Sequence, residues 1–279
     1  MKKTFLFVCA AFMTLAVSAQ DLGKAVESYN TAAGMISVSK AQAIAGFQDA
    51  LKQAEACAED AEGQRNALIE NCKTSIANFT LSIAKDYLKE NDFDKACEQL
   101  KAAVEVAGQY GIDDVAKEAS DLIPTAYLAK GNHALKNKDF LGAADAYQKV
   151  LELDTNNGKA ALNLGMAQSQ AGNIDAAEEA FKKAMAAGED KAAAKQLGKL
   201  YLKKANAAYK AGNFKAAYDE AMTSIEYDAS PNAYKIAGNA CVKTENKAKA
   251  VECFEKYLQL SPNAKDAEQI KATIAILKK

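Results

Sequence analysis

The feature that most constrains the fold of this chain is an internal repeat with a period of 34 residues. It is clearest over residues 124–190, where two consecutive copies align at their informative positions. The coinciding pairs are Gly131 with Gly165, Phe140 with Ile174, Ala143 with Ala177, and Tyr147 with Phe181. A fixed period in this range is typical of repeat architectures. Small residues at repeat positions 8 and 20 let two helices approach closely, and an aromatic residue at position 24 fills the space between them. The pattern predicts a helix-turn-helix unit.

The repeat resembles the tetratricopeptide repeat (TPR). That family has a large residue at position 4, Leu-Gly at 7 and 8, Tyr at 11, Ala at 20, Phe at 24 and Pro at 32. Composition agrees, because about half of the 279 residues are hydrophobic and the chain has only three prolines and no tryptophan. The resemblance implies an all-α fold, a right-handed α-α superhelix (TPR solenoid) of about five to six helix-turn-helix repeats with a C-terminal capping helix.

The repeat rhythm also predicts how the chain is divided. We expect a signal peptide at 1–19, a degenerate N-terminal repeat at 20–60, a long helix and the first clear TPR with an extra helical linker at 61–123, four TPR repeats at 124–263, and a capping helix at 264–279. Within the four repeats there is an offset of six residues, because the alanine that follows Ala177 in phase is Ala217, 40 positions on. The final segment carries an apolar stripe, which we interpret as a cap rather than a membrane contact.

The first 20 residues indicate export. Lys2 and Lys3 precede an apolar run from Phe5 to Val17, followed by small residues that suit cleavage after Ala19. The leader looks like those of Gram-negative envelope proteins, so we expect the periplasm, with an extracellular location as the alternative. No later stretch is apolar enough for a transmembrane segment. Without the leader the chain has 33 basic and 36 acidic residues, a balance that argues against nucleic acid as a partner.

Catalytic and metal-binding patterns are missing from the sequence, so we expect neither an enzyme nor a cofactor. His133 is the only histidine, and it falls among polar residues of a predicted helix. Glycines stand singly rather than in a phosphate-binding loop. The acidic pairs Asp113-Asp114 and Glu178-Glu179 are expected on solvated helix faces, and Asp139, Asn173 and Asn213 recur at the helix connections. Cys241 and Cys253 lie on facing helices of one repeat, where they could form a disulfide or serve as small core residues.

The TPR resemblance implies a binding surface for a protein or peptide. In that family, positions 2, 5, 9, 12 and 13 of each repeat line a concave groove. Eight of these 25 side chains are lysine and none is acidic, which favours an acidic extended peptide with its backbone bound by asparagine amides. The candidate groove residues are Lys85, Lys89, Asn132, Lys136, Asn163, Lys199, Lys203, Asn206, Lys210, Asn239 and Lys243. Other residues at groove positions include Leu135, Met166, Ser169, Gln170, Leu202, Tyr209, Asn232 and Lys235.

Two alternatives remain open at this stage. Lysine at position 13 lies near a helix C-terminus, where it would complement the helix dipole without any ligand. Four residues, Asn132, Asn163, Lys199 and Lys203, also occupy places of the carboxylate clamp found in chaperone-adaptor TPR domains, but Lys203 stands where that clamp has arginine. The alternative function is a structural subunit of a cell-envelope assembly that docks through its convex face or helix ends. The sequence does not indicate the oligomeric state.

Overall fold

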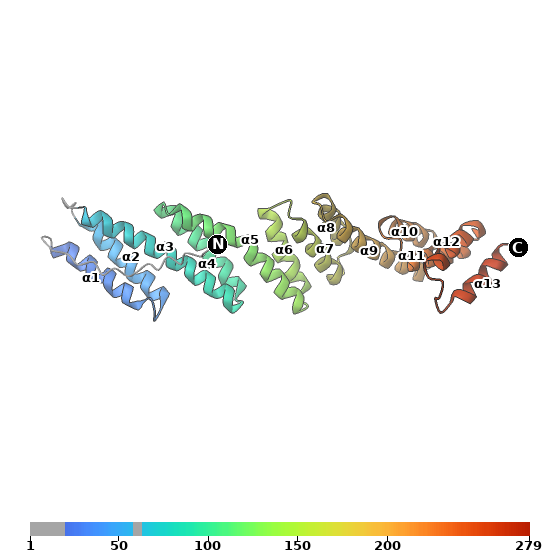
Figure 1. Ribbon diagram of the computed structural model, residues 1–279, viewed down its shortest axis with the longest axis horizontal. Coiled ribbons are helices and arrows are strands. Elements are labelled where there is room, and N and C mark those ends of the chain that lie inside the picture. Colours follow the sequence, from blue (N-terminus) through green and yellow to red (C-terminus); the bar gives the residue numbers. More distant parts are fainter. Residues whose placement is uncertain (1–19, 58–62) are drawn as a thin grey trace. The chain divides into compact units, whose positions relative to one another are not determined.

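The computed structural model describes residues 20–57 and 63–279. Within these ranges the chain forms thirteen α-helices and no β-strand (Figure 1). The helices are α1 (Gln20–Met35), α2 (Lys40–Ala56), α3 (Gln64–Glu90), α4 (Phe93–Tyr110), α5 (Asp113–Lys136), α6 (Phe140–Leu153), α7 (Gly158–Ala171), α8 (Ile174–Ala186), α9 (Asp190–Lys210), α10 (Phe214–Tyr227), α11 (Pro231–Lys243), α12 (Lys247–Leu260) and α13 (Ala267–Leu277). The expected signal peptide at 1–19 lies outside the described residues.

The chain divides into two compact units, one ending at Lys130 and the other beginning at Gly131. In the first unit, α1 packs on α2, α2 on α3, and α3 on α4. In the second unit, each helix from α6 to α13 packs on the next one along the chain (Figure 1). Short connections of this kind make successive helices antiparallel neighbours. Both units are therefore arrays of helix pairs, and the predicted all-α repeat fold is confirmed.

In three of the helix pairs, close contact between the two helices depends on glycine at repeat position 8. A Cβ atom at Gly131 would lie 2.6 Å from the Tyr147 ring, and one at Gly165 would lie 2.5 Å from the Phe181 ring. Gly238 stands in the same relation to Phe254, with a distance of 2.6 Å. All three rings are buried. The packing roles predicted for positions 8 and 24 are confirmed, because a side chain at position 8 would occupy the space that the ring fills.

The connections inside the helix pairs share one local design. The first or second residue after the first helix of each pair has a left-handed backbone conformation. These residues are Asn91, Lys138, Gly172, Gly212 and Glu245. The following residues Asp92, Asp139, Asn173, Asn213 and Asn246 are the N-caps of α4, α6, α8, α10 and α12. The Asp139 carboxylate accepts a hydrogen bond from the Gly142 N–H at 2.9 Å, which satisfies one of the free donors of the first turn. The prediction that Asp139, Asn173 and Asn213 belong to helix connections is confirmed.

Three helices are longer than one repeat requires. The long helix expected at the start of 61–123 is α3, with 27 residues. The extra helical linker and the first helix of the next repeat form one continuous helix, α5, which contains Pro124. The six-residue offset is absorbed as additional turns at the start of α9, because α9 begins at Asp190 whereas its repeat begins at Gly198.

The repeat formed by α9 and α10 packs differently from its neighbours. Its position 24 is Ala221 rather than an aromatic residue. The buried Ser224 hydroxyl instead donates a hydrogen bond to the Gly198 carbonyl at 2.7 Å, linking α10 to α9. The rings of Tyr201 and Tyr227 stack with their centroids 5.6 Å apart. Polar and ring-stacking contacts replace the usual glycine–aromatic contact in this pair.

The C-terminal helix α13 packs on α12 through Ile270, which is buried, while Ile274 and Leu277 are partly buried beside it. Across residues 20–57 and 63–279, the helices are all too short or too polar to cross a membrane. The cysteines of the described chain, Cys57, Cys72, Cys97, Cys241 and Cys253, are all free thiols. Cys241 and Cys253 are buried and unbridged, so they serve here as core residues.

Candidate binding groove

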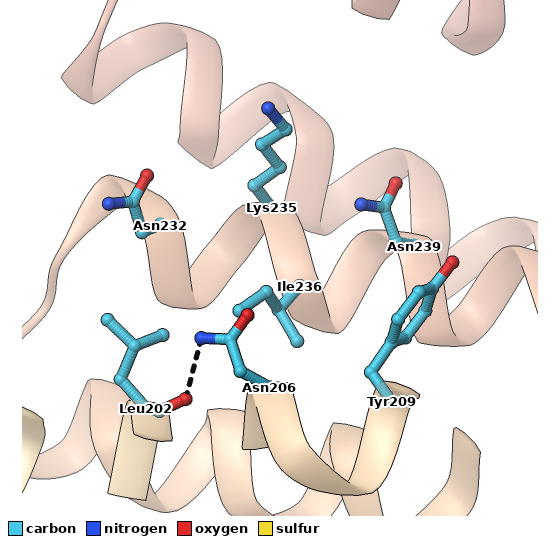
Figure 2. A pocket seen from close by; sticks show the side chains of 7 residues that line it. All are labelled: Leu202, Asn206, Tyr209, Asn232, Lys235, Ile236 and Asn239. Atoms are coloured by element: carbon cyan, nitrogen blue, oxygen red, sulfur yellow. Dashed lines mark hydrogen bonds between the residues drawn. The ribbon is translucent and has the colours of Figure 1, made fainter. Parts of the chain in front are cut away.

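Seven residues of the second unit line an open hollow between α9 and α11, which we call the amide hollow. It measures about 330 Å³ and is lined by Leu202, Asn206, Tyr209, Asn232, Lys235, Ile236 and Asn239. Figure 2 shows the α9 side chains facing those of α11 across this space, with Ile236 between them. Six of the seven occupy the groove positions named from the sequence. Ile236 is the exception, because it follows a groove position and lies toward the facing helix.

The amide hollow has polar groups but little net charge. The Lys235 ammonium is 2.5 Å from the Asp266 carboxylate, which also accepts a 2.5 Å hydrogen bond from the Tyr257 hydroxyl. Hydrogen bonds from Lys235 and Tyr257 lower the pKa of Asp266 and keep it ionised. Asn206 donates to the Leu202 carbonyl at 2.9 Å (Figure 2). Because an amide both donates and accepts, Asn232 and Asn239 can bond a peptide backbone here.

A second hollow, the lysine hollow, lies in the same unit. It measures about 530 Å³ and is lined by Leu135, Lys138, Phe140, Met166, Ser169, Gln170, Phe181, Gln196 and Lys199. Five of these were named as groove positions. Sequence reasoning missed Lys138, Phe140, Phe181 and Gln196, which come from a turn, from second helices and from the added turns of α9. The groove positions implied by the family resemblance all lie within the first helix of a repeat, so these four residues fell outside the candidate set.

Comparison with known proteins identifies the repeat. Tetratricopeptide repeat family models match residues 81–158, 134–200 and 232–264. The chain belongs to the tetratricopeptide repeat family. TPR proteins are in general non-catalytic, and their repeats serve as protein-interaction modules. This protein is therefore a protein-interaction module.

Several solved structures are similar to the TPR chain. The MamA protein is 26% identical with a TM-score of 0.41, covering 57% of this chain and 84% of that one. YrrB, described as a TPR protein with an unusual peptide-binding site, is 22% identical with a TM-score of 0.40, covering 74% and 96%. PilW, described as a widely conserved type IV pilus biogenesis factor, is 15% identical with a TM-score of 0.36, covering 70% and 98%. No protein with a curated description matches the sequence.

The remaining candidate groove residues of the TPR array fall into two groups. In the first unit, Lys85 pairs with Glu118 at 2.7 Å, and Lys89 lies 3.0 Å from Asp86, a carboxylate that also pairs with Lys40. In the second unit, Lys199 lines the lysine hollow, and Asn206 and Asn239 line the amide hollow. The others line neither hollow: Lys136, Lys203, Lys210 and Lys243 are exposed, Asn163 is half-buried, and Asn132 accepts a 2.8 Å hydrogen bond from Tyr147. Three of the eleven candidates, Lys199, Asn206 and Asn239, thus line one of these two hollows.

One acidic residue departs from expectation. Glu178 was predicted on a solvated helix face, and this prediction was wrong, because its side chain is only 17% exposed. Its carboxylate accepts hydrogen bonds from Lys182 at 2.6 Å, Tyr201 at 2.6 Å and Lys204 at 2.7 Å. Burial alone would raise the pKa of Glu178, but these three hydrogen bonds outweigh it and lower the pKa to about 2. The cluster ties α8 to α9.

Groupings that could hold a metal are absent from the described part of the chain. His133 is exposed on α5, and Asp113 and Asp114 are exposed in the first turn of the same helix, as expected for solvated residues.

Proposed function

We propose that this protein binds an extended segment of a partner protein along the first helices of its second unit and carries out no catalysis. The observation that supports this most directly is the amide hollow. There, two helices one repeat apart bring Asn206, Asn232 and Asn239 to a common space. Paired amides across a groove suit a peptide backbone, which offers alternating donors and acceptors along its length.

The distribution of charge supports the same proposal and favours an acidic peptide as the ligand. The second unit, residues 131–279, holds 22 basic and 18 acidic residues, whereas residues 20–130 hold 11 and 18. The second unit thus has an excess of basic residues, and an acidic peptide would be attracted to it. Such attraction weakens as salt screens the charges, with a Debye length of about 10 Å at 0.1 M ionic strength.

We also propose that the protein acts after export, with the periplasm as its compartment. The basis is the leader at 1–19, with its two lysines, apolar run and small residues before Gln20. The partner would then be another envelope protein.

Site-specific photo-crosslinking tests the groove. A photoreactive phenylalanine analogue replaces Tyr209 in the amide hollow, and in a matched variant it replaces Leu260, which is 47% exposed on α12 and lies outside both hollows. We expect a crosslinked partner from position 209 only, and we expect it to disappear when Asn206→Ala and Asn239→Ala are added. Crosslinking from position 260 alone would reject the groove and favour a subunit that docks through its outer surface.

A further inference from the structure

The longest acid-free stretch of the chain contains a regular row of lysines on α9. From Lys191 to Tyr218 the sequence has seven lysines and no acidic residue. We call Lys191, Lys195, Lys199 and Lys203 the α9 lysine row. These four recur at every fourth residue, so they share one face of the helix and span about 18 Å. All four are exposed, and none is within 4.0 Å of a carboxylate in the described chain.

Helix electrostatics do not explain this row. A lysine in the first turn meets the positive end of the helix dipole, and Lys191 is the second residue of α9. Lysines four residues apart on one face also repel each other. Other lysines nearby do have partners: Lys204 pairs with Glu178 at 2.7 Å and Lys215 with Asp219 at 3.5 Å. The row is therefore unfavourable within the free protein, and an anionic partner would relieve it.

The row borders the lysine hollow, whose lining includes apolar side chains. Lys199 and Gln196 line the hollow from α9, while Phe140 and Met166 line it from α6 and α7. At about 530 Å³ the hollow falls within the range of small ligand sites and can accept a large apolar side chain. Lys138 adds a second lysine to the lining. The hollow thus combines apolar surface with lysines from two separate elements.

Lys138 has a backbone conformation that a lysine rarely adopts. Its φ angle is +62°, and the same repeat position holds Gly172 and Gly212, with φ angles of +88° and +80°. Glycine adopts this left-handed conformation without the steric cost that a Cβ atom brings. The turn does not require lysine, and at this position the lysine contributes to the lining of the hollow.

We propose that the lysine hollow and the α9 lysine row form one subsite, and that its ligand is an acidic protein segment in which carboxylates flank a large apolar side chain. The apolar side chain enters the hollow against Phe140 and Met166. The flanking carboxylates contact Lys138 on one side and Lys199 and Lys195 on the other. This inference rests on the proposed groove function and adds to it the chemistry of the ligand.

Fluorescence anisotropy with a defined probe tests the subsite. The probe is a labelled synthetic peptide, blocked at both ends, in which glutamates flank one phenylalanine; blocking removes any terminal carboxylate. We expect mature protein carrying Lys195→Glu and Lys199→Glu to bind it about tenfold more weakly. The control variant carries Lys183→Glu and Lys256→Glu, two exposed lysines on α8 and α12, and has the same net charge. It should bind within about twofold of the unaltered protein. Equal binding by the two double variants would overturn the proposal.

Changes to the probe test the two halves of the ligand separately. We expect serine in place of phenylalanine, or glutamine in place of the glutamates, to weaken binding about tenfold each. If either change has no effect, that half of the proposal is wrong. A single-stranded DNA oligonucleotide that binds more tightly than the peptide would also overturn the assignment to a protein segment.

Failure of the subsite is distinguishable from failure of the groove. If the Asn206→Ala, Asn239→Ala variant loses its photo-crosslinked partner while the lysine variants keep it, the groove function stands and the subsite is wrong. If neither set of changes affects partner binding, the groove proposal and the subsite proposal are both wrong.

Discussion

Gly165 and Phe181 are in direct contact across the α7–α8 pair, and a Cβ atom on Gly165 would come within 2.5 Å of the Phe181 ring. Phe181 is 1% exposed and cannot move outward without opening the core. This contact recurs between Gly131 and Tyr147 and between Gly238 and Phe254. Repetition of one contact sets the separation of the two helices in each of these pairs.

Gly165→Ala is therefore expected to destabilise the protein although alanine is the better helix former. Overpacking a core site costs about 1–3 kcal/mol, more than the gain of about 0.5–1 kcal/mol from replacing a helical glycine. Urea unfolding followed by circular dichroism measures the difference. Gly108→Ala is the matched control, because nothing lies within 4 Å of its added Cβ, and it should raise stability slightly. Equal effects at the two sites would contradict this account of the pair.

Lys138→Gly is expected to stabilise the protein and to weaken binding of the acidic probe. Removing a side chain from a left-handed position relieves about 1–2 kcal/mol, partly offset by the greater freedom of glycine in the unfolded chain, for a net gain of about 0.5–1 kcal/mol. Glu245, with a φ angle of +57°, occupies the same repeat position but lines neither hollow. Glu245→Gly should give the same rise in thermal stability with unchanged probe binding.

Stability should fall at acidic pH as Glu178 is protonated. The pKa of Glu178 is lowered from 4.5 to about 2 in the folded protein, so its contribution is fully present above pH 4.5 and is lost as the pH falls from 4.5 through about 2. We expect this contribution to be about 2 kcal/mol, reduced from the full shift because the group is partly solvated. Glu178→Gln should flatten the pH dependence of the unfolding free energy in this window, and Glu179→Gln, at an exposed neighbour, should not.

The native protein should react with alkylating reagents at one cysteine. Cys57 is half-buried, whereas burial raises the pKa of Cys72 to about 12 and that of Cys253 to about 11, which suppresses the thiolate. Burial also raises the pKa of Cys97 and of Cys241. Iodoacetamide labelling at pH near 8 followed by mass spectrometry should modify Cys57 first. Labelling after unfolding without reductant should then reach all five described thiols; if Cys241 and Cys253 remain unlabelled, they are bridged in the isolated protein.

Export predicts a defined mature end. N-terminal sequencing of protein recovered from the cell envelope should begin at Gln20, because the small residues Ser18 and Ala19 suit a signal peptidase. Recovery of chains that still begin at Met1 from the cytoplasmic fraction alone would contradict the export proposal.

Much of the fold was predictable because it depends on local periodicity. The spacing of Gly131, Ala143 and Tyr147 places three small or aromatic residues on facing helix surfaces, and the structure has them there. The amide hollow was predictable for the same reason, since a side chain's face on a helix follows from its position in the repeat. Asn206 and Asn239 hold equivalent positions in adjacent repeats and therefore line the same hollow.

The charge state of the candidate site could not be predicted in this way. Lys85 and Lys235 occupy groove positions, yet each pairs with a carboxylate that is distant in sequence. Lys85 pairs with Glu118, 33 residues on, and Lys235 pairs with Asp266, 31 residues on. Lys138 and Phe140 reach the lysine hollow from a turn and a second helix. Helical periodicity therefore settled which residues share a face, because it depends only on neighbours along the chain. Packing between helices settled which lysines have carboxylate partners and where apolar side chains leave a hollow, because these depend on residues that only the fold brings together.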